Sequence, residues 1–75
     1  MDQFELERLW ASMPGIEGVA FRFRDAVRVK YGEHAREVGN VVALLSVEPI
    51  PTYVVELSLS GKSLTLAQSQ LEQAA

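Results

Sequence analysis

A cluster of basic residues in the middle of the chain is the clearest candidate for binding chemistry. Four cations share one parity of an alternating segment, namely Arg22, Arg24, Arg28 and Lys30. On an extended strand, residues two apart are about 7 Å apart on one face, near the spacing of successive phosphates. Tyr31 and His34 come next and carry rings that can stack on bases. The pattern is typical of a nucleic-acid contact surface.

The same residues also fit a sheet face that meets only solvent. Asp25, Glu33 and Glu37 lie among the cations and would neutralise much of their charge. Exposed charges also protect a sheet edge against unwanted pairing. The whole chain has a net charge of −3, which weighs against a partner with a phosphate backbone. We therefore favour the solvated face and keep nucleic acid as the alternative.

Catalytic and metal chemistry find little support in the sequence. The chain has no cysteine, which excludes disulfides and thiol chemistry. His34 is the single histidine, and a turn seldom brings Glu33 and Glu37 together with it as metal ligands. Gly61-Lys62-Ser63 is similar to the end of a phosphate-binding loop, but Glu56 stands where that loop needs glycine. We expect no enzyme, cofactor or small-molecule substrate.

The length and composition indicate one small domain over residues 1–75. Such a short chain buries only roughly 60% of its unfolded surface, whereas 48% of its residues are hydrophobic. Some apolar surface is thus left for a partner or a second copy. The N-terminus does not have the pattern of a signal peptide, and the longest apolar run, Val41–Leu45, is too short to span a membrane. We expect a cytoplasmic protein without a membrane partner.

Residues 1–13 are predicted to form a helix. Asp2 is a suitable N-cap, with Glu5 three residues later. Pro14-Gly15 ends the helix. One apolar stripe has helical spacing and consists of Leu6, Leu9, Trp10 and Met13.

The remainder of the chain alternates with period two, as strands do. Residues 19–31 predict two strand pieces that bend at Arg24-Asp25, with Phe21 and Phe23 on the inner parity. Residues 40–47 are apolar on both faces, as in a central strand. The later segments predict a hairpin with its turn at Ser60-Gly61, then a short helical turn that frays. Four or five such antiparallel strands indicate a small barrel or sandwich.

The segment from Asp25 to Val41, "DAVRVKYGEHAREVGNV", resembles the KOW motif of small SH3-like barrels. Gly32 and Gly39 match the outer glycines of that motif. The flanking strand positions match at Val27, Val29 and Val41. Position 36 is Arg where the motif usually has a glycine of positive φ, so we expect a different turn there. The final residues, "TYVVELSLSGKSLTLAQSQLEQ", resemble the closing hairpin and final helical turn of the same barrels.

The resemblance implies a mainly β fold, with an N-terminal α-helix followed by a five-stranded antiparallel SH3-like barrel over residues 19–71. In KOW domains the strand-turn-strand contacts RNA or protein. Carried over by position, the contact residues would be Lys30, Tyr31, His34 and Arg36. This barrel hosts many unrelated functions, so the fold alone does not select one.

We expect a non-catalytic interaction module that binds a protein partner or itself. The predicted contact residues are spare apolar side chains, namely Phe4, Trp10, Val42, Leu44 and Val54. Val42 and Leu44 would form a second apolar face of residues 40–47, opposite Val41. The alternative is a KOW-type module associated with RNA or the ribosome, which uses the cations above. A third candidate is an immunity or inhibitor protein that also acts by protein binding.

Overall fold

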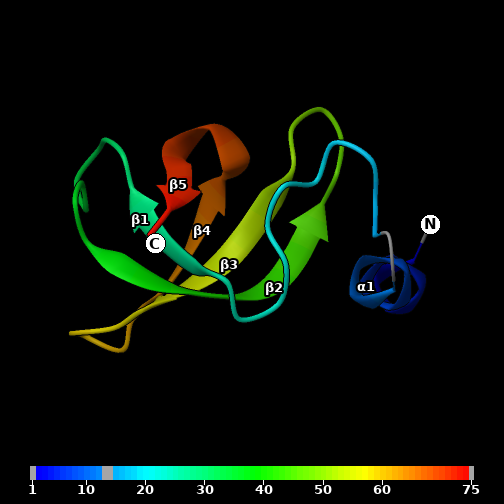
Figure 1. The fold of residues 1–75 in the computed structure, drawn as a ribbon, viewed down its shortest axis with the longest axis horizontal. Coiled ribbons are helices and arrows are strands. Elements are labelled where there is room, and N and C mark those ends of the chain that lie inside the picture. The colour runs from blue at the N-terminus through cyan, green and yellow to red at the C-terminus, as the bar shows by residue number, and fades with distance from the viewer. Residues whose placement is uncertain (1, 13–14, 75) are drawn as a thin grey trace.

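The computed structural model describes residues 2–12 and 15–74 of the chain. One helix precedes a five-stranded antiparallel sheet with the strand order β4-β3-β2-β1-β5 (Figure 1). The elements are α1 (Gln3–Ala11), β1 (Ala26–Val29), β2 (Val38–Ser46), β3 (Thr52–Leu57), β4 (Ser63–Ala67), the 3₁₀ helix η1 (Gln68–Gln70) and β5 (Leu71–Gln73). The predicted mainly β class with an N-terminal helix is confirmed. Strands β4 and β5 are the two edges, and among the described residues no ladder joins them, so the sheet is not closed.

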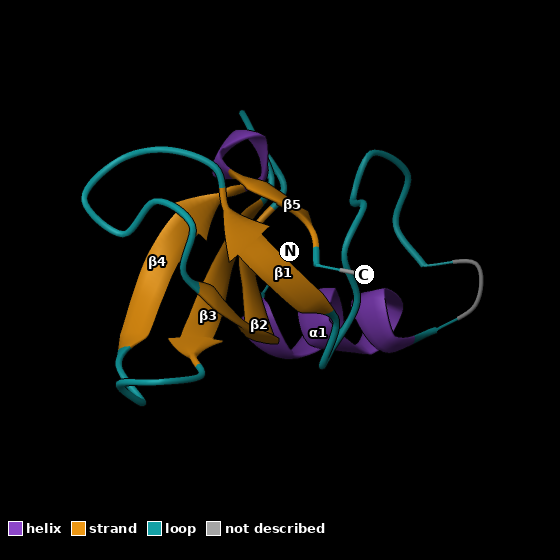
Figure 2. Cartoon of the chain, turned by 60° about the vertical axis from the view of Figure 1, so that its left-hand side comes forward, coloured by secondary structure: helices purple, strands orange, loops and turns teal. Residues whose placement is uncertain are grey.

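The sheet curls around a core of aliphatic and aromatic side chains, and α1 packs beside β2 (Figure 2). The period-two pattern predicted this core, because side chains of one parity point to the inside of the curl. Its fully buried members are Val27, Val29, Val41, Leu44, Tyr53, Val55 and Leu57.

Helix α1 begins as the sequence predicts. The Asp2 side chain accepts a 2.8 Å hydrogen bond from the backbone N–H of Glu5 and so caps the first turn. Leu6 and Trp10 are buried against the sheet, whereas Leu9 is partly exposed. The predicted bounds at Met1 and Met13 lie outside the described residues.

The prediction of a strand piece over residues 19–24 is wrong. This segment runs as a loop, because distant side chains take the place of ladder partners. Ala20 N–H donates to the Gln68 side chain at 2.8 Å, and the Phe21 carbonyl accepts from Trp10. As a result Phe21 is buried but Phe23, predicted to be inward, is 55% exposed.

The prediction that Leu44 lies opposite Val41 is also wrong. The pairing of β2 with β3 shifts between Val41 and Ala43, as in a β-bulge. A bulge adds one residue and reverses the parity of the residues after it. Val41 and Leu44 therefore both point into the core, and Leu44 is 0% exposed.

The turn between β1 and β2 explains Gly32, and the close approach of β2 to β3 explains Gly39, the two glycines of the KOW-like segment. Gly32 has φ +99°, and a Cβ on Gly39 would lie 2.3 Å from the Glu56 carbonyl oxygen. The reason for expecting a different turn at Arg36 does not hold, since Arg36 itself adopts φ 75°. An arginine thus occupies the left-handed conformation that usually favours glycine.

The C-terminal end pairs with the sheet instead of fraying. The predicted helical turn is confirmed as η1. The next residues then form β5, which pairs with β1 through Val29 and Leu71. The predicted number of five strands is therefore correct. However, β5 is the fifth strand, in place of the strand predicted over residues 19–24.

Candidate functional site

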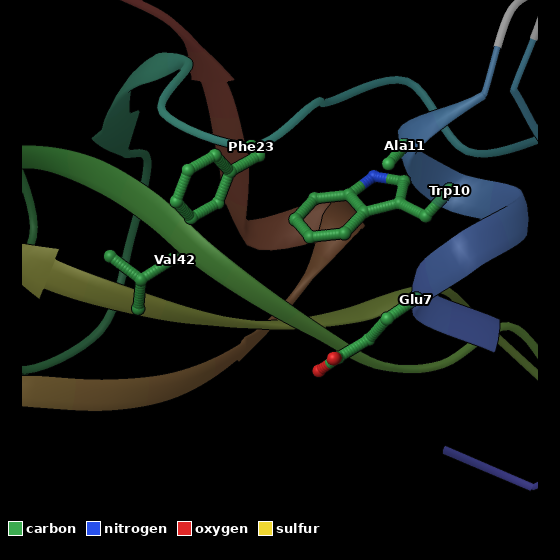
Figure 3. Close-up of a pocket in the computed structure, with 5 residues that line it drawn as sticks. All are labelled: Glu7, Trp10, Ala11, Phe23 and Val42. Atoms are coloured by element: carbon green, nitrogen blue, oxygen red, sulfur yellow. The ribbon is translucent and has the colours of Figure 1, made fainter. Parts of the chain in front are cut away.

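A groove opens between α1 and the outer side of β2. We call it the helix–sheet groove, and its lining consists of Glu7, Trp10, Ala11, Phe23 and Val42 (Figure 3). Its volume is about 290 Å³, slightly below the roughly 300–1,000 Å³ of small-molecule sites. The groove therefore has room for one or two side chains of a partner.

Two aromatic rings form adjoining walls of the helix–sheet groove. The centroids of Trp10 and Phe23 lie 6.4 Å apart with an interplanar angle of 84°, an edge-to-face contact. Trp10 is only 6% exposed, and Tyr53 packs behind it with ring centroids 6.5 Å apart. One wall is thus rigidly held in the core, while Phe23 stands out from the loop before β1.

A second hollow of about 380 Å³ continues from the groove and shares Phe23 and Val42 with it. Its other lining residues are Arg24, Asn40 and Glu56. The Arg24 guanidinium carbon lies 5.3 Å from the centroid of Phe23, in a cation–π contact. The Asn40 side chain donates a 3.2 Å hydrogen bond to the Arg24 carbonyl and holds this loop against β2.

Glu7 places a carboxylate at the edge of the helix–sheet groove, where Figure 3 shows it reaching beneath Trp10. The Gln3 side chain donates a 3.4 Å hydrogen bond to it. In the described ranges no cation lies within ion-pair distance of Glu7. The groove is therefore apolar, with an uncompensated negative charge at its rim.

The predicted protein-contact residues do not form one surface. Phe4 is 78% exposed on α1, and Val42 lines the groove. Trp10 contributes to both the groove and the core. Leu44 is wholly buried and Val54, half-buried, pairs across the ladder with Ala43 and Thr65. The structure thus brings together Trp10 and Val42, whereas Phe4 lies six residues before Trp10 on the helix.

The predicted cationic stripe is not assembled on a strand. Of its four members only Arg28 lies within β1, and it forms a 3.4 Å ion pair with Glu72. Arg22 lies in the preceding loop and donates a 3.3 Å hydrogen bond to the Ser12 carbonyl. Arg24 stacks on Phe23, and Lys30 is exposed just after β1.

The remaining residues of the nucleic-acid prediction lie in or near the turn after β1. Tyr31 and His34 line a hollow of about 290 Å³ that also includes Leu64 and Leu66. The Nδ1 atom of His34 is 2.7 Å from a Glu37 carboxylate oxygen. Arg36 is exposed in the same turn. The turn therefore presents a mixture of charges around its rings.

Sequence reasoning missed Glu7 and Phe23 as site residues. Glu7 lies three residues before Trp10, which predicts neighbouring positions on a helix. That signal was available for Glu7. No such signal was available for Phe23. Its exposure depends on a loop, and the period-two pattern of the sequence predicts a strand at that place.

No protein-family model matches the chain, and no curated protein matches it. No helix in the described part of the chain has both the length and the apolar character needed to cross a membrane. Within residues 2–12 and 15–74, no three side chains of the His, Cys, Asp or Glu types gather as metal ligands do.

Proposed function

We propose that this chain is a non-catalytic interaction module, which binds a protein partner or a second copy of itself through the helix–sheet groove. One observation carries the proposal: an open groove that is lined by buried Trp10, exposed Phe23 and Val42. Aromatic residues in desolvated pockets are the usual energetic centres of protein interfaces. Exposed Phe4 adds apolar area on the same helix.

We further propose that the curled sheet is an SH3-like barrel of the KOW type. The β3–β4 hairpin followed by η1 agrees with the closing hairpin and final helical turn on which the resemblance rests. The positions of Gly32 and Gly39 also support it, since one lies in a positive-φ turn and the other lets β2 approach β3 closely. A fold of this type leaves the function to its surface sites.

The RNA-binding alternative has less support. A phosphate-tracking surface needs several free cations in a row, but Arg28 is paired with Glu72 and Arg24 stacks on Phe23. The negative charge of Glu33 and Glu37 also lies beside the turn. We therefore place the protein partner first.

Light scattering across a wide concentration range tests self-association, and selection of displayed random peptides tests binding of a partner. We expect either a dimer or a set of selected peptides whose binding is lost in Phe23→Ser. Leu59→Ser is the matched control, because Leu59 is 95% exposed on the β3–β4 turn and does not line the groove. A monomer that selects no Phe23-dependent peptide would refute the proposal.

A further inference from the structure

The helix–sheet groove combines apolar walls with one carboxylate, and this combination defines the chemistry of its ligand. We infer that the groove receives a lysine or arginine side chain from a basic segment of a partner protein. The inference rests on the proposed function and names the partner class. Its first observation is the position of Glu7, whose carboxylate borders an apolar hollow. No cation of the described residues lies within ion-pair distance of this carboxylate.

The aromatic walls suit a cation as well as an apolar group. The faces of aromatic rings carry negative potential and attract ammonium and guanidinium groups. Phe23 already holds the Arg24 guanidinium 5.3 Å from its centroid, outside the helix–sheet groove and toward the second hollow. Trp10, the stronger cation–π partner of the two residue types, borders the groove next to Glu7.

The apolar and charged parts of the groove lining determine which kind of side chain fits it. Val42, Ala11 and the two rings offer only apolar surface, whereas Glu7 provides a charge at the rim. Lysine and arginine bury an aliphatic stem on apolar surface and keep the charged head at the edge. Such a side chain would pack its stem on Val42 and direct its head to the Glu7 carboxylate.

Charge complementarity favours a different protein over a second copy. The start of the chain carries Asp2, Glu5 and Glu7 against the single cation Arg8. Two copies that meet through α1 would bring these carboxylates together, which is unfavourable. The second hollow is lined by one cation and one carboxylate, Arg24 and Glu56. The uncompensated charge therefore lies at the Glu7 end, where a basic partner segment gains most.

The test uses three short peptides that differ only at two central positions, which hold lysine, norleucine or glutamate between leucines. Trp10 is the single tryptophan of the chain and lines the groove, so its fluorescence reports binding. We expect the lysine peptide to half-saturate at a concentration about fivefold lower than the norleucine peptide, and the glutamate peptide to bind weakest. Glu7→Gln should remove the difference between lysine and norleucine.

The matched control is Glu5→Gln, which removes the same charge from the same helix but does not line the groove. It should keep most of the lysine preference. Equal binding of the lysine and norleucine peptides would overturn the inference while leaving the groove as a protein-binding site. A lysine preference that persists in Glu7→Gln, or no fluorescence change with any peptide, would also overturn it. The proposed function is decided separately by the Phe23-dependent selection.

Discussion

The indole Nε1 of Trp10 donates a 2.7 Å hydrogen bond to the backbone carbonyl oxygen of Phe21. This bond joins α1 to the loop before β1, which has no strand ladder of its own over residues 19–24. Phe23 lies two residues further on and forms the outer wall of the helix–sheet groove. The geometry of the groove thus depends on one buried contact between a helix and a loop.

Replacing Trp10 by phenylalanine tests this dependence. Trp10→Phe keeps an aromatic ring but leaves the Phe21 carbonyl without its donor, so we expect the free energy of unfolding to fall by about 2 kcal/mol. Urea unfolding followed by circular dichroism measures the change. Phe4→Leu, on the exposed side of α1, should change it by less than about 0.5 kcal/mol. Similar losses in both variants would argue against a special role for the Trp10 bond.

The elements governed by local signals could be predicted from the sequence. The Asp2 cap depends on a residue three positions away, and the inward parity of Val27 and Val29 depends on the period of the strand. These signals lie within a few residues of their effects. The helix, most of the strands and the central place of β2 could be predicted from them.

The features that position the groove depend on contacts between distant residues. The loop at Ala20 is held by Gln68, which is 48 residues away in the sequence. The side chain of Gln68 also accepts a hydrogen bond from the Tyr53 hydroxyl and donates to the Gly18 carbonyl at 3.0 Å. Alternating residues cannot reveal such a contact, so the loop was predicted as a strand and Phe23 as buried. The bulge after Val41 is equally invisible to periodicity.

Gly39 is required by the close approach of β2 to β3. A Cβ there would lie 2.3 Å from the carbonyl oxygen of Glu56, an atom that moves only with its strand. We expect Gly39→Ala to lower the free energy of unfolding by about 3 kcal/mol.

Gly32→Ala separates this steric effect from backbone strain. Gly32 has φ +99° but nothing lies within 4 Å of its added Cβ, so the loss should be about 1 kcal/mol. Chemical denaturation of the two variants gives the comparison. Equal losses would mean that the contact with Glu56 is not what requires glycine at position 39.

Arg36 offers a stabilising substitution. Its φ of 75° lies in the left-handed region, which costs a non-glycine residue roughly 1–2 kcal/mol. Arg36→Gly removes this strain but adds freedom to the unfolded chain. We expect a net gain of about 0.5–1 kcal/mol, or a rise in Tm of roughly 2–8 °C.

Ala35→Gly is the control for Arg36→Gly, because Ala35 is an exposed neighbour whose φ is not positive. There glycine brings only the entropic cost, so stability should fall by about 0.5 kcal/mol. Thermal unfolding compares both variants with the parent chain. A lower Tm for Arg36→Gly would contradict the strain argument.

The buried hydroxyl of Tyr53 makes stability sensitive to alkaline pH. Burial raises the pKa of Tyr53 above 10.0, and the negative charge of Asp25 acts in the same direction, against the backbone hydrogen bonds from Phe21 and Ala20. The folded state thus favours the neutral phenol. The stability that Tyr53 contributes is fully present at a pH below its pKa in the unfolded chain, which is about 10. It is lost as the pH rises through the higher pKa of Tyr53 in the folded state.

Urea unfolding at about pH 8 and about pH 11 measures this loss. Tyr53→Phe should start from lower stability at the lower pH, because the hydroxyl no longer bonds Gln68. It should also lose less on going to the higher pH, since no phenol ionises at this position. The control is Tyr31→Phe, which removes an exposed tyrosine and keeps all other titrating groups of the parent chain. Its free energy of unfolding should therefore fall between the two pH values as much as that of the parent chain. An equally steep decline in Tyr53→Phe would show that another group governs the alkaline limit.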